Sequence, residues 1–172
     1  MLNVDTLQAF LRYSDWANEE VLRAAASLTE ESLDLPFDMG RGSLRMTLLH
    51  LHAGEDVWLR RWQGFTETPW PDESEKATVE TIHARFRATW LQRSRFMATL
   101  KAADAENRVA YRDSKGTLFK ATLGEMMVQA IVHSTHHRAQ AVNMIRRLGG
   151  AVVEVDYMIW VRQPVETIVR PA

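Results

Sequence analysis

The chain has 172 residues, of which 46% are hydrophobic, and its 21 Lys and Arg nearly balance 22 Asp and Glu for a net charge of −1. This length and apolar content suffice for one core, so we predict a single domain over residues 1–172, and the absence of cysteine excludes disulfides, Cys-ligated metal centres and a cysteine nucleophile. The balanced charge lacks the basic excess of a nucleic-acid-binding module, so we predict no nucleic-acid partner.

The amino-terminal segment predicts a long amphipathic helix rather than a targeting signal. It lacks a basic region followed by an apolar stretch, and no run in the chain approaches the ~18 apolar residues of a membrane span, so we expect a cytoplasmic protein without membrane contact. Apolar residues recur every three or four positions from Leu7 to Leu28, which predicts a helix over about 5–28.

Two further apolar stripes follow along the chain. After the glycines at 40 and 42, Ser43 is a candidate N-cap, and the stripe behind it predicts a helix over about 43–63. Beyond a proline-containing loop, a third stripe predicts a helix over about 79–102 whose outer face is rich in arginine.

The last third of the chain combines a hairpin with the clearest helix signal. Two short alternating runs flank Asp113–Gly116, which predicts a small β-hairpin. Thr122 and Glu125 have the spacing of a capping box ahead of a long apolar stripe that ends at a Gly-Gly pair, and residues 156–161 predict a short closing helix. The fold class is therefore all-α: a four-helix bundle with a hairpin before the last long helix and a short C-terminal helix.

Two of the six histidines, His133 and His137, lie four residues apart in that last long helix. On a helix they are offset by about 40° and one turn, so both imidazoles can converge on one ion, although both could instead be core histidines satisfied by hydrogen bonds. Ala130 and Ala141, one turn to either side, leave space for a third ligand. His50 in the second long helix is the leading candidate, because its neighbours on the same side of that helix are apolar.

The other histidines fit such a site less well. His52 points about 200° away from His50 on a helix, and we predict that it lies on the surface or at an interface. His136 lies at the edge of the stripe, about 60° from His133, where a role beside the ligands is favoured over ligation. His83 is predicted to be a histidine at the edge of the core.

Other metal and catalytic patterns do not match. A zincin needs glutamate directly after the first ligand histidine, where this chain has Ser134, and a di-iron bundle needs two Glu-x-x-His motifs, of which only Glu80–His83 is present. Gln129 could hydrogen-bond a ligand or substrate, or be a polar boundary residue. Glu55 and Asp56 do not lie beside His50 on the helix, so the sequence identifies no proton-transfer residue.

Three segments resemble one known family. The segment 133–140, His-Ser-Thr-His-His-Arg-Ala-Gln, closely resembles the His-x-x-His-His-Arg-Gly-Gln signature of the DinB-like (damage-inducible) superfamily. The segment 47–59, in which His50 precedes Trp58 by eight residues, resembles the family's second helix, and 13–19 resembles its opening helix. The chain departs from the signature at Ala139, where glycine is usual, and at Val132, where asparagine often stands.

The resemblance implies a DinB-like four-helix bundle, often a homodimer, that binds a divalent ion through three histidines corresponding to His50, His133 and His137. Zinc, nickel, iron and manganese are all compatible with imidazole ligands. Relatives in the wider superfamily include enzymes that use low-molecular-weight thiols, so the resemblance favours a metal-dependent thiol transferase or hydrolase with a small-molecule substrate. Because the chain has no cysteine, a thiol would arrive as a cosubstrate.

Two alternatives stay open at this point. The chain could be a non-catalytic helical bundle for binding or dimerisation with structural histidines, since six Trp and eight Met suit a pliable apolar pocket or interface. A third hypothesis, nucleic-acid binding through Arg85, Arg87, Arg93 and Arg95, has less support, because such a charged row is usually a solvated helix face.

Overall fold

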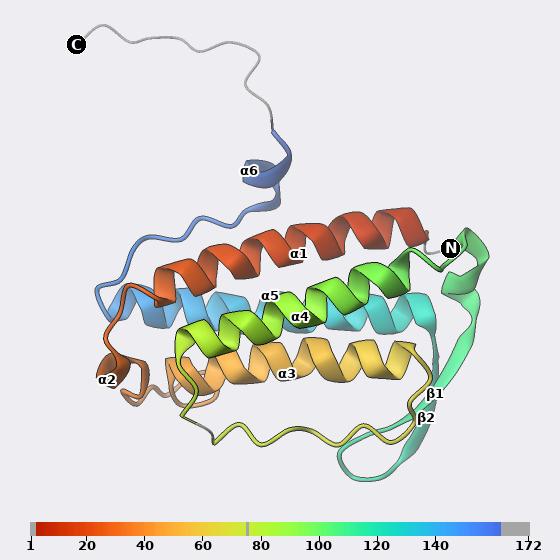
Figure 1. Cartoon of the computed structure of the whole chain (residues 1–172), viewed down its shortest axis with the longest axis horizontal. Helices are drawn as coiled ribbons and strands as arrows, with labels where there is room; N and C mark the ends of the chain where they lie inside the picture. Colours follow the sequence, from red (N-terminus) through yellow and green to blue (C-terminus); the bar gives the residue numbers. More distant parts are fainter. Residues whose placement is uncertain (1–2, 75, 163–172) are drawn as a thin grey trace, which may run out of the picture.

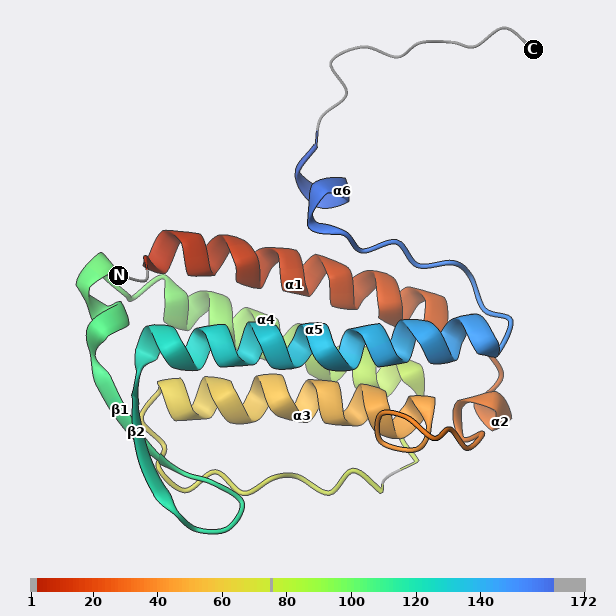
Figure 2. The same ribbon diagram turned by 180° about the vertical axis from the view of Figure 1, so that it is seen from behind.

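Four long helices lie side by side in the computed structural model, which describes residues 3–74 and 76–162 (Figure 1). They are α1 (Val4–Ala25), α3 (Leu44–Trp62), α4 (Val79–Met97) and α5 (Leu123–Arg147). The shorter elements are α2 (Glu30–Leu33), the 3₁₀ helix η1 (Ala102–Glu106), the antiparallel strands β1 (Arg108–Arg112) and β2 (Leu118–Thr122), and α6 (Tyr157–Val161). Seen from the other side, α5 lies between α1 and α3 and packs against both (Figure 2). The predicted bundle, hairpin and closing helix are confirmed.

Helix starts follow the predicted caps, whereas two predicted ends are too late. The Ser43 side chain accepts the amide of Met46, and Thr122 and Glu125 form the reciprocal capping box of α5. The first helix ends at Ala25 and the third at Met97, earlier than the predicted ends near 28 and 102. The apolar stripe runs on because Leu28 and Leu100 still pack against the core from the loops that follow. Apolar spacing therefore reports contact with the core rather than helical backbone.

The core consists of two apolar clusters separated by buried polar residues. One cluster includes Leu22, Leu48 and Ile82, and the other includes Leu11, Leu59 and Met127. Between them on the four long helices lie buried polar side chains: Ser14 and Asn18 of α1, Glu55 of α3, Thr89 and Arg93 of α4, and Ser134 and Arg138 of α5. Because buried polar groups need defined partners, this layer favours one alignment of the four helices over others.

Glu55 is the centre of that layer. Its carboxylate accepts hydrogen bonds from Asn18 Nδ2 at 2.7 Å, Arg93 Nη1 at 2.8 Å, Trp90 Nε1 at 3.0 Å and Ser134 Oγ at 3.3 Å. Arg93 also pairs with Asp15. The predicted row of solvated arginines is thus wrong at Arg93, which turns inward because the partly exposed Asp15 of α1 and the buried Glu55 of α3 compensate its charge.

Arg45 makes a second ionic cluster at the start of α3, in which the arginine is buried and its carboxylate partners are exposed. Its side chain, 5% exposed, donates to Asp34 Oδ1 at 2.8 Å, Glu30 Oε2 at 2.8 Å and the carbonyls of Glu30 and Ala77 at 2.8 and 2.6 Å. One guanidinium therefore ties α2, the start of α3 and the chain just before α4 together. The hydrogen bond from Arg45 holds the pKa of Asp34 below its ordinary value.

Among residues 3–74 and 76–162, no helix is both long and apolar enough to cross a bilayer.

Candidate metal centre

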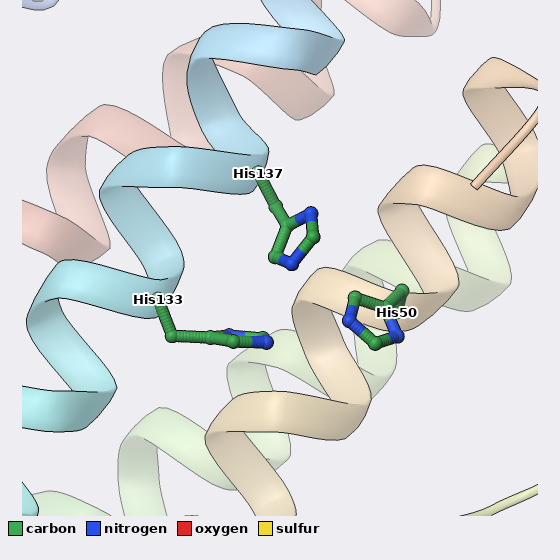
Figure 3. A group of neighbouring side chains, drawn as sticks. All are labelled: His50, His133 and His137. Atoms are coloured by element: carbon green, nitrogen blue, oxygen red, sulfur yellow. The ribbon is translucent and has the colours of Figure 1, made fainter. Parts of the chain in front are cut away.

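The structure brings together the three histidines that the sequence analysis selected. His50 comes from α3, and His133 and His137 come from successive turns of α5 (Figure 3). One ring nitrogen of each lies within 4.8 Å of the other two. The ring centroids are 5.2 Å apart for His50 and His133, 4.4 Å for His50 and His137, and 4.5 Å for His133 and His137. Three imidazoles from two packed helices thus face one small space, and their role as ligands stays a prediction.

Gly54 allows α3 and α5 to approach closely at this point. It lies one turn after His50, and a Cβ atom built there would be 2.4 Å from Cε1 and 2.6 Å from Nδ1 of His133. The His133 ring therefore occupies the space that any side chain at position 54 would fill. The glycine, which is otherwise unfavourable within a helix, is explained by this packing.

Hydrogen bonds fix two of the three rings from behind. His50 Nδ1 lies 2.5 Å from Oε1 of Glu73, and His137 Nδ1 lies 2.8 Å from Oε1 of Gln140. Both oxygens are acceptors, so each Nδ1 acts as the donor, and Nε2 is the ring nitrogen left for an ion. Outer partners of this kind are typical of metal-binding histidines, because they set the tautomer and the orientation of the ring.

Glu73 is itself held in place by two donors. Its carboxylate is 7% exposed, accepts the Trp70 indole N–H on Oε1, and pairs through Oε2 with Arg41 Nε at 3.1 Å. Both Glu73 and Trp70 belong to the connection between α3 and α4, which runs back along α3 in Figures 1 and 2. This connection thus forms one wall of the three-histidine site.

The environment of His133 and His137 favours their neutral form. Burial lowers the pKa of His133 to about 3, and the charges that His137, His50 and His136 would carry act in the same direction. Burial also lowers the pKa of His137, which the hydrogen bond to Gln140 partly opposes. Neutral imidazole is the form that binds a metal ion, so the environment favours ligation near neutral pH.

The remaining predicted histidines lie outside this cluster. His52 was predicted to lie on the surface or at an interface; it is half-buried where α3 packs against α4, with Nε2 3.2 Å from Thr89 Oγ1. His83 lies at the core edge as predicted, 2.5 Å from Glu19 Oε2. His136 is exposed, and Gln140 Nε2 lies 3.1 Å from its Nε2.

No proton-transfer residue was predicted, and the structure places the candidates that were considered away from the rings. Gln129 is exposed. Glu55 is enclosed by α1, α4 and α5 rather than by His50, and burial raises its pKa to about 7, against the hydrogen bonds from Trp90 and Ser134. Glu55 is therefore a structural carboxylate in this arrangement.

Sequence reasoning missed Glu73 and Gln140. Gln140 could have been found, because it lies three residues after His137 on the same helix face. Glu73 lies in a loop 23 residues from His50, where no periodicity relates the two positions.

Replacing Gly54 by alanine is expected to lower the free energy of unfolding, because the new Cβ collides with His133. Overpacking costs about 1–3 kcal/mol, against the ~1 kcal/mol that alanine gains in helix propensity. Chemical denaturation measures the difference. In a His133→Ala background, where the ring is absent, Gly54→Ala should be neutral or stabilising, and an equal loss in both backgrounds would contradict the assigned contact.

Comparisons with known proteins agree on one family. The model of the DinB family matches residues 1–164. Protein DinB of Bacillus subtilis (strain 168) is 20% identical over 156 residues, which are 86% of this chain and 89% of that protein. The crystal structure of a DinB-like protein from Bacillus cereus ATCC 10987 has a TM-score of 0.63 at 20% identity over 83% of this chain and 93% of that one. A DinB family member from Shewanella denitrificans has a TM-score of 0.58 at 16% identity over 93% of both chains.

Proposed function

Because the chain belongs to the DinB family, we propose that it binds a divalent metal ion through His50, His133 and His137. The observation that carries the proposal is the convergence of three ring nitrogens within 4.8 Å of one another. Three neutral imidazoles are a common donor set for zinc, nickel, iron and manganese. Three protein ligands also leave room for an exogenous group, as in catalytic rather than structural sites.

The surrounding residues support ligation over a purely structural role. Structural histidines in a core usually donate and accept hydrogen bonds with both ring nitrogens, whereas His50 and His137 each use Nδ1 on an outer partner and turn the other nitrogen toward the shared space. The ring of His133 makes no hydrogen bond within residues 3–74 and 76–162. The ring is nevertheless fixed, because it lies against Gly54.

We further propose that the protein is a metal-dependent enzyme of the thiol-transferase or hydrolase type. A divalent ion held by neutral ligands keeps its full charge and supplies Lewis acidity toward a thiol or water. The chain itself contributes orientation: Glu73 and Gln140 fix two ligand rings, and Trp70 covers His50 with ring centroids 4.9 Å apart. Without cysteine, the thiol of a transferase reaction comes from a small cosubstrate.

The homodimer is part of the same proposal. An apolar cavity of about 230 Å³ between α1 and α5, lined by Phe10, Val128 and Ile131 among others, supports a self-association surface there. Phe10 is 40% exposed. Light scattering of the sample prepared for metal analysis gives its mass in solution.

Metal uptake tests the proposed function. Protein purified without a histidine tag and stripped with a chelator should take up one zinc or nickel ion per chain, measured by elemental analysis, and should melt at a higher temperature with the ion. At 100-fold excess over Kd the ion adds about 2.7 kcal/mol to the free energy of unfolding. Absence of uptake together with an unchanged melting temperature would favour a non-catalytic bundle. The loaded protein is then assayed for thiol transfer and ester hydrolysis.

A further inference from the structure

A second cavity, lined mainly by polar and charged residues, lies next to the three-histidine site. It has a volume of about 720 Å³ and is bounded by the end of α3, the connection between α3 and α4, and the β1–β2 hairpin. Its lining includes Arg61, Thr68, Trp70 and Arg112. Trp70 is shared with the histidine site, where its ring lies 4.9 Å from that of His50.

Arg61 is the most unusual residue of this cavity. It is 7% exposed, and its guanidinium contacts the rings of Trp58 and Tyr111, 4.7 Å from each centroid, while the two rings meet edge to face with centroids 5.4 Å apart. Nε donates to Thr68 Oγ1 at 2.9 Å and Nη2 donates to the carbonyl of Arg112 at 2.9 Å. Nη1 makes no hydrogen bond to any residue that the structure describes, and no carboxylate there forms an ion pair with Arg61.

Such a charge is costly to bury. Buried Arg45 and Arg93 have carboxylate partners, and buried Arg138, which forms no ion pair within the described residues, donates to Ser14, Asn18 and Thr135. Burial lowers the pKa of Arg61, and the electrostatic effects of Tyr111 and Asp113 oppose that lowering only in part. A buried charge normally has a partner, and Nη1 of Arg61 has none among the described residues. An anion supplied by a ligand could therefore be that partner.

Two carboxylates line the cavity, those of Asp113 and Glu67, and neither forms an ion pair with Arg61. Asp113 uses Oδ1 to accept the backbone amides of Lys115 and Thr117, both at 2.9 Å, within the hairpin turn. Glu67, which is 74% exposed, pairs with Arg112 Nε at 2.8 Å. An incoming anion therefore competes with one exposed carboxylate for Arg112, whereas no carboxylate of the described residues forms a direct ion pair with Arg61.

We propose that this cavity binds the carboxylate or phosphate group of a small molecule, with Arg61 as the principal partner and Arg112 as the second. Hydrogen bonds to Thr68 and to the carbonyl of Arg112 fix two nitrogens of the planar guanidinium, and the remaining Nη1 is suited to an oxyanion. Arg61 lies eleven residues after His50 on α3, on nearly the same face and about 16 Å along the helix axis. That this molecule is the substrate of the metal centre, with its anionic end at Arg61, rests on the proposed function; the anion site itself does not.

Calorimetric titration of chelator-stripped protein with inorganic phosphate and with succinate tests the anion site without the metal. Wild type should bind at least one of the two, and which one separates a phosphate ester from a carboxylate. Arg61→Lys should weaken binding about tenfold, since it removes charge-assisted hydrogen bonds in a fixed fork. Arg60→Gln is the matched control, because Arg60 is exposed and pairs with Asp56, and it should leave binding unchanged.

Glu67→Gln provides a test that does not depend on a buried substitution. Removing the competing carboxylate at this exposed position should tighten anion binding about threefold. No binding to wild type, or equal affinity in Arg61→Lys, or no gain in Glu67→Gln would overturn the proposal. Metal content and anion affinity measured on Arg61→Lys and on His137→Ala keep the two hypotheses apart, because Arg61→Lys should keep the metal and bind the anion more weakly, whereas His137→Ala should lose the metal and keep its anion affinity.

Discussion

A His137→Ala chain is expected to bind zinc or nickel more than about 100-fold more weakly than wild type, because a change in a direct ligand exceeds the effect of a change in an outer partner. His137 contributes one of the three nitrogens that lie within 4.8 Å of one another. With two imidazoles left, the remaining positions would be filled by water or by exogenous groups. Metal content after dialysis against a weak chelator measures the loss, and His50→Ala and His133→Ala should give the same result.

Two further variants make this result specific. His52→Ala removes a histidine of α3 that faces α4 rather than the site and should leave the stoichiometry unchanged. Glu73→Gln keeps an acceptor near His50 Nδ1 but removes its charge, and it should weaken metal binding about 10- to 100-fold. Unchanged metal content in all three ligand variants would contradict the proposed site, and an unaffected Glu73→Gln chain would contradict the role given to Glu73.

Arg45→Met is expected to produce the largest loss of stability, about 3 kcal/mol in the free energy of unfolding. Methionine can fill the space of the aliphatic stem, but the carbonyls of Ala77 and Glu30 lose their donor. For a chain of this size the melting temperature should fall by about 6–12 °C. Arg60→Gln, which breaks an exposed pair with Asp56, should cost less than ~1 kcal/mol. Equal losses in the two variants would show that the Arg45 cluster adds nothing.

The Arg45 cluster also predicts how the difference in unfolding free energy between wild type and Arg45→Met depends on pH. The hydrogen bond from Arg45 lowers the pKa of Asp34 from its ordinary 3.8. A lowered pKa means that the stabilisation is complete above the unfolded-state value and is lost as the pH falls through the folded-state value. The stability gap between wild type and Arg45→Met should therefore narrow below about pH 4, and a gap that widened there would contradict the assignment.

The parts of the fold that sequence predicts well are those fixed by local repetition. The long helices follow from apolar spacing, and the start of α5 follows from the Thr122–Glu125 capping box. His133 and His137 could be paired in advance because one helical turn separates them. His50 could be added because its own helix presents it on an apolar side, although no local sequence pattern indicates which face of α3 packs against α5.

The residues that sequence analysis missed depend on contacts between distant segments. Arg45, Arg61 and Arg93 occur in sequences typical of exposed helix faces, yet all three are buried. Their positions depend on partners in other segments, such as Asp34, Asp15 and the hairpin carbonyl of Arg112, which no helical period relates to them. Gly54 likewise carries no signal in α3, since its importance lies in the imidazole that occupies its side-chain space.

The connection between α3 and α4 contributes residues to both proposed sites, so binding at one site can affect binding at the other. Glu73, which orients His50, and Trp70, which lines the anion cavity, are three residues apart on one stretch of backbone and share a hydrogen bond. A ligand that orders this stretch from the cavity side would lower the entropy lost when an ion binds on the other side. By thermodynamic reciprocity the ion would then strengthen anion binding by the same factor, making occupancy of the two sites mutually reinforcing.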